Sequence, residues 1–136
     1  MKSERQDMRQ RTRQFALRII KLYAALPKTV EAQVLGKQIL RSGTSVGAQY
    51  HEACRAKSNA DFISKIEGGL QELDETLYWL ELLAEAKIVS SKRLEPLHRE
   101  TNELIAMFVN MAKGLKHKKA DERHGVVIPH PSALIP

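Results

Sequence analysis

Apolar residues recur at steps of three and four along most of this 136-residue chain, which is the spacing of an amphipathic helix. The clearest run covers residues 62–84. Ser58 stands just before it and can cap a helix, and Asp61 can reach back in a variant of the capping box. The pattern predicts a helix that begins directly after Ser58.

Two further runs have the same spacing. One covers residues 8–26 and stops at Pro27, which cannot continue a helix. The other covers residues 94–115, and we expect its helix to end near Gly114.

A fourth helix is predicted over residues 29–57, although it contains a run of small residues from Ser42 to Ala48. We expect it to be continuous because no proline interrupts it and the apolar phase carries across. Gly43 and Gly47 lie on one face, and each costs a helix about 1 kcal/mol relative to alanine. Close packing within the bundle or between subunits would offset this cost. The alternative is a ligand held in the groove that the two glycines leave on this face of the helix.

Short connections near Pro27, Ser58 and Ser90 place consecutive helices antiparallel. The sequence therefore predicts an all-α fold: an antiparallel up-down-up-down four-helix bundle over residues 1–116. Residues 117–136 contain three prolines and no periodicity, and we expect them to form a mobile C-terminal tail.

The charges support the pairing of the second and third helices. If the hairpin folds about residue 58, three opposite charges face each other, and each exposed pair contributes about 0–1 kcal/mol. The predicted pairs are Arg41 with Glu75, Glu52 with Lys65 and Arg55 with Asp61.

Some apolar residues fall outside the main seam of their helices. A helix that is apolar on more than one face usually has more than one neighbour, which favours self-association. A broad core that absorbs both faces is the alternative. The residues concerned are Leu17, Ile20, Tyr23, Tyr78, Trp79 and Leu82.

The net charge is +6, and it is unevenly distributed, with seven Lys or Arg against two acidic residues in positions 1–26. Arg5, Arg9 and Arg13 recur every four residues, so they form one ridge that can follow nucleic-acid phosphates. Aromatic residues do not interleave with this ridge, so we do not expect base stacking. Lysines at the end of the last helix can also simply complement its dipole. The candidate nucleic-acid-binding residues are Arg5, Arg9, Arg13, Arg18, Lys21, Lys113 and Lys116.

Catalytic and metal-binding motifs are incomplete. The run around Gly43 lacks the lysine and the preceding strand of a phosphate-binding loop, and Arg55 stands where a zinc protease helix needs its second histidine. Glu95 and His98 supply one half of a di-iron motif whose other half is missing. We therefore expect no enzymatic activity, no cofactor and no metal.

The cellular compartment is predicted from the cysteine count and from the absence of membrane and secretion signals in the sequence. Cys54 is its only cysteine, and it has neither an 18-residue apolar run nor a signal-peptide core. We expect a cytoplasmic protein without a membrane partner.

A family resemblance rests on the central segment. The chain resembles the 23S rRNA intervening-sequence proteins from about Phe15 to about Leu115, except at Gln49, where the family commonly has asparagine, and at Gly68-Gly69, where a helix-favouring pair is typical. The residues that carry the resemblance are Leu40 to Tyr50, Glu52-Ala53, Asp61-Phe62, Lys65, Glu72, Asp74 to Thr76 and Tyr78 to Leu80. Its structural motif includes Arg41, Gly43, Gly47, Glu52, Lys65 and Glu75.

The resemblance implies a ring-like homo-oligomer, a pentamer, without an established catalytic activity. It also implies a relation to a basic pentameric accessory protein of diversity-generating retroelements, which is thought to bind nucleic acid and a reverse transcriptase. Our leading hypothesis is a homo-oligomeric bundle that binds RNA or DNA through its basic residues. The alternative is a scaffold that receives a partner protein and whose basic charge is incidental.

Overall fold

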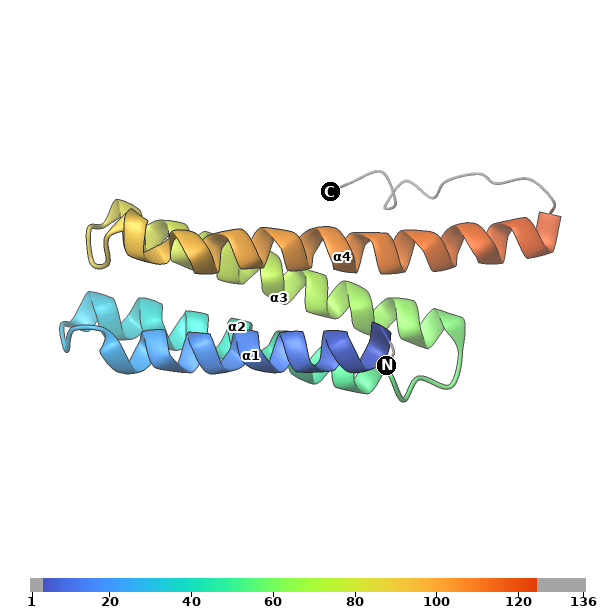
Figure 1. Cartoon of the computed structure of the whole chain (residues 1–136), viewed down its shortest axis with the longest axis horizontal. Helices are drawn as coiled ribbons and strands as arrows, with labels where there is room; N and C mark the ends of the chain where they lie inside the picture. Colours follow the sequence, from blue (N-terminus) through green and yellow to red (C-terminus); the bar gives the residue numbers. More distant parts are fainter. Residues whose placement is uncertain (1–3, 125–136) are drawn as a thin grey trace.

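The computed structural model describes the backbone of residues 4–124 and the side chains of residue 5 and residues 7–114. Within these residues the chain forms four helices and no strands: α1 (Glu4–Ala25), α2 (Val30–Ala53), α3 (Asn59–Glu85) and α4 (Ser91–His124) (Figure 1). The predicted all-α, antiparallel four-helix bundle is confirmed. None of the described helices combines the length and the apolar character needed to cross a membrane.

The helix starts follow from the capping residues. The side chain of Thr29 accepts a hydrogen bond from the backbone N–H of Ala32 at the start of α2. The Ser58 hydroxyl accepts one from the N–H of Asp61 at 3.1 Å, as the sequence predicts. These bonds satisfy N–H groups that have no partner inside the helix.

The predicted end of the last helix is wrong. Helix α4 passes Gly114 and continues to His124. A single glycine costs a helix only about 1 kcal/mol, and lysines near a helix C-terminus complement its dipole. The tail predicted over residues 117–136 therefore begins inside the helix, and residues 125–136 lie outside the part of the chain that the structure describes.

The core runs along the inside of all four helices. It includes Ile19 of α1, Ile39 of α2, Leu73 of α3 and Phe108 of α4, which are almost completely buried. Helix α2 packs against α1 and α3, and α3 packs against α4, whereas α1 and α4 make few contacts with each other. In Figure 1, α1 and α4 run along the same side of the molecule, each backed by its neighbour.

The small-residue run lies under α1. A Cβ atom built on Gly43 would be 2.6 Å from Cγ1 of Ile19, and one built on Gly47 would be 3.4 Å from the Thr12 hydroxyl. Helix α2 is continuous through both positions, as predicted. Side chains of α1 fill the groove over the glycines, so the glycines permit close packing within one subunit instead of holding a ligand.

The hairpin register is confirmed by two of its three predicted ion pairs. Arg41 pairs with Glu75 and also with Glu72 at 3.0 Å, and Lys65 pairs with Glu52 at 2.9 Å. The third pair, Arg55 with Asp61, does not form among the described side chains. Helix α2 ends at Ala53, so Arg55 lies in the connection, and the expected facing positions no longer exist there.

Candidate nucleic-acid interface

The candidate nucleic-acid-binding side chains of α1 are exposed. No acidic side chain that the structure describes forms an ion pair with Arg9, Arg13, Arg18 or Lys21. The guanidinium of Arg5 instead lies over the ring of Phe62, with its central carbon 5.6 Å from the ring centroid. These cations are available to an anionic partner.

The structure brings only part of the predicted set together. Arg5, Arg9 and Arg13 follow one line along α1, which we call the α1 ridge. Nine residues separate Arg9 from Arg18, which is two and a half helical turns, so Arg18 lies on the other side of α1. Lys21 stands eight residues after Arg13, the same offset that separates Arg5 from Arg13, so it lies on the continuation of this line two turns further along α1. Of the two, only Arg18 lies away from the ridge.

The candidate residues Lys113 and Lys116 of α4 lie at the same end of the bundle as the start of α1, because α1 and α4 are antiparallel (Figure 1). Lys113 is half-buried. Lys116 belongs to α4, but its side chain lies outside the described residues.

Sequence reasoning gave no specific role to Arg11. Its guanidinium donates two hydrogen bonds to the Glu100 carboxylate, at 2.8 and 2.7 Å, and one to Glu103 at 2.9 Å. These bonds raise the pKa of Arg11 above its usual value, although partial burial opposes the rise. Arg11 therefore joins α1 to α4, and its charge is compensated within the protein. The matching signal in the sequence is the pair of acids three residues apart on α4.

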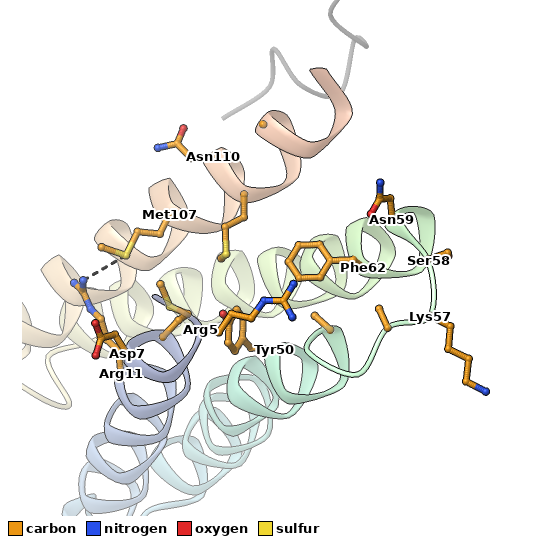
Figure 2. A pocket seen from close by; sticks show the side chains of 15 residues that line it. Arg5, Asp7, Arg11, Tyr50, Lys57, Ser58, Asn59, Phe62, Met107 and Asn110 are labelled. Carbon is orange, nitrogen blue, oxygen red and sulfur yellow. Dashed lines mark hydrogen bonds between the residues drawn. The ribbon is translucent and has the colours of Figure 1, made fainter. Parts of the chain in front are cut away.

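A groove of about 940 Å³ opens at this end of the bundle, between α1, α4 and the connection from α2 to α3 (Figure 2). Its apolar lining comes from all four helices, and its charged lining consists of Arg5, Asp7 and Arg11 from α1 and Lys57 from the connection. The lining includes Arg5, Met8, Lys57, Phe62, Met107 and Asn110.

Tyr50 forms part of the groove wall from α2. Only 2% of the residue is exposed, and its ring packs against that of Phe108, with centroids 6.0 Å apart. Burial raises the pKa of Tyr50 to about 12, and a hydrogen bond with Cys54 adds to the effect. The phenol is therefore neutral at physiological pH.

The half di-iron motif does not converge on a metal site. His98 contacts Glu81 of α3 at 3.0 Å, while Glu95 pairs with Arg99 on its own helix. Within residues whose side chains are described, no group of three His, Cys, Asp or Glu residues could hold a metal ion.

Comparison with known proteins decides the family. The 23S rRNA-intervening sequence protein family matches residues 4–110, which include most of the bundle and the whole α1 ridge. The chain belongs to this family.

A solved relative supports the assignment. A protein of unknown function from the S23 ribosomal protein family of Bacteroides thetaiotaomicron shares 39% sequence identity with this chain. The alignment covers 77% of this family member and 97% of the other chain, with a TM-score of 0.73. The comparison with curated proteins finds no match.

Proposed function

We propose that this family member is a non-enzymatic, homo-oligomeric bundle that binds RNA or another structured nucleic acid through the α1 ridge. The observation that carries the proposal is the exposure of Arg5, Arg9 and Arg13 on one line without an acidic partner among the described side chains. The family name, which refers to intervening sequences of 23S rRNA, favours RNA as the nucleic acid.

The ridge suits contacts with the phosphate backbone. Eight residues separate Arg5 from Arg13, so the ridge is about 12 Å long at the rise of an α-helix. Arginine side chains bind phosphate oxygens through paired N–H groups, and each contact releases condensed counterions. Such contacts give affinity and orientation without reading a base sequence.

Exposed apolar side chains support self-association. Leu17 and Ile20 are nearly half exposed on α1, Tyr78 is more than half exposed on α3, and Val30 and Val34 are exposed on α2. Contacts between subunits would remove this surface from water at a gain of about 25 cal/mol per Å². A pentamer is the assembly that we expect.

Salt dependence tests the RNA-binding proposal. The logarithm of the affinity for a short RNA should fall linearly with the logarithm of the salt concentration, and replacing both Arg9 and Arg13 by alanine should reduce the slope by about 1.4 to 1.8. Lys92→Ala with Arg93→Ala is the control, because it removes the same charge from exposed residues at the other end of the bundle.

The outcomes separate the two hypotheses. An equal change in both double variants would show that the net charge acts without a ridge. Absence of binding at low salt would exclude the RNA hypothesis and leave the protein-scaffold alternative.

A further inference from the structure

We propose that the groove beside the α1 ridge holds an unpaired base of the bound RNA, stacked on Phe62. The ligand class would then be single-stranded or looped RNA, and not a continuous duplex. This inference rests on the proposed RNA binding by the ridge. It concerns a different set of residues, so the two can fail separately.

The apolar lining fits the flat face of a base. Phe62 is partly buried and packs against the core, and Met8, Met107 and Met111 complete the surface around the groove. Thioether sulfur is polarisable and makes favourable contacts with aromatic rings. Stacking of a base on an aromatic side chain is tolerant of sequence, because every base has a π-face.

Two side-chain amides lie at the rim of the groove. The side-chain amides of Asn59 and Asn110 line the groove, and neither forms a side-chain hydrogen bond with a residue that the structure describes. An amide carries both donors and an acceptor, as do the edges of unpaired bases. Figure 2 shows Asn59 at the start of α3, on the same element as Phe62, and Asn110 on α4 with its amide directed away from Phe62.

The groove and the α1 ridge share a cation, Arg5. Arg5 is the first residue of the α1 ridge and also lines the groove, where Lys57 adds a second cation. Arg11 and Asp7 line it as well; Glu100 and Glu103 compensate the charge of Arg11, so Arg5 and Lys57 stand against the single carboxylate of Asp7. A strand whose phosphates follow the ridge therefore reaches the groove at Arg5, and its next base stacks on Phe62 when the Arg5 guanidinium, which lies over that ring, turns to the phosphate.

The size of the groove favours a nucleotide over a partner helix. Its lining residues span Arg5 to Arg11 on α1 and Met107 to Gly114 on α4, each a length of about 10 Å. An amphipathic helix of three or four turns would extend well beyond both segments. The paired bases of a duplex are stacked within it and do not enter such an opening.

No local sequence pattern indicates this site, because no aromatic residue lies within the basic ridge itself. Phe62 is 57 positions from Arg5, and the antiparallel packing of the bundle brings the two together. The expectation against base stacking considered only aromatic residues near the ridge in the sequence, whereas Phe62 is near it in space.

Three RNA probes separate base contacts from charge. Fluorescence anisotropy on the full chain at low salt compares a short single-stranded RNA, the same strand annealed to its complement, and an abasic ribose-phosphate chain of equal length. We expect the single strand to bind at least about tenfold more tightly than either of the others, in keeping with the energy of one stacked base.

Two variants test the position of the base. Phe62→Leu keeps an apolar side chain, so it should lower single-strand affinity about tenfold and leave duplex and abasic affinity unchanged. Gly114→Leu should have the same effect by filling the groove, because a Cβ atom at Gly114 meets nothing within 4 Å and the fold is not disturbed. Gly114→Ala is its matched control and should leave binding unchanged.

Equal binding of the three probes, or full single-strand binding by both variants, would overturn the base site while the ridge stands. Failure of every probe to bind would overturn both proposals. Displacement of the single strand by an acidic amphipathic peptide at lower concentration than by unlabelled RNA would assign the groove to a protein partner instead.

Discussion

The side chain of Gln49 on α2 lies against Gly68 on α3. A Cβ atom built on Gly68 would be 3.1 Å from the amide atoms of Gln49, and one built on Gly69 would be 3.5 Å from the Gln49 Cβ. The chain departs from the typical family pattern at these positions. In the structure the two departures complement each other, because the longer side chain of Gln49 occupies the space that a side chain at position 68 would need.

This contact predicts that substitutions at the two positions are not additive. Gly68→Ala alone should change the free energy of unfolding little, because the gain in helix propensity is offset by crowding against Gln49. Combined with Gln49→Asn, it should stabilise the protein by about 1 kcal/mol relative to Gln49→Asn alone. A double-mutant cycle in urea measures the coupling, and additive effects would contradict the contact.

The glycines of α2 should differ in their tolerance of alanine. Gly43→Ala forces a methyl group against Ile19, which is completely buried, and should destabilise the protein by about 1–3 kcal/mol. Gly47→Ala meets the Thr12 hydroxyl at an ordinary contact distance, so it should be neutral or slightly stabilising. Gly47→Leu should disrupt folding, because a larger side chain meets Thr12 of α1. Urea unfolding of the alanine variants gives the order, and equal losses would contradict the packing described.

Arg11 should matter for stability and not for RNA binding. Arg11→Met removes the link to α4 and leaves Glu100, a mostly buried carboxylate, without its partner, so we expect a loss of about 1–3 kcal/mol. The salt slope of RNA binding should stay unchanged, since Glu100 and Glu103 already compensate the charge. A slope reduced as in the Arg9 and Arg13 variants would show that Arg11 binds phosphate.

Alkaline pH should weaken the fold through Tyr50. Its pKa is raised from 10.0 to about 12, so above pH 10 the unfolded chain loses this proton before the folded protein does. The folded state then binds more protons, and stability falls by about 2 kcal/mol as the pH rises from about 10 to 12. Urea unfolding across this range measures the fall. Tyr50→Phe should flatten it, and an unchanged pH profile in that variant would assign the loss to other groups.

The sequence predicts the helices well, because a cap such as Ser58 bonds to a residue only three positions away. It predicts the α2–α3 hairpin well because, once the turn is placed, a fixed register relates facing positions such as Arg41 and Glu75. It misses the end of α4, because one glycine does not outweigh helix-favouring neighbours. The partners of Arg11 lie about ninety positions away, and the groove is assembled from four helices. No local pattern contains that information.

Sedimentation velocity of the full chain with a labelled single-stranded RNA tests the central proposal most directly. We expect the protein alone to sediment as an assembly larger than the 15.4 kDa chain, and the labelled RNA to sediment with it at low salt and to separate at high salt. A protein that sediments as a monomer, with the RNA sedimenting freely at every salt concentration, would contradict the account.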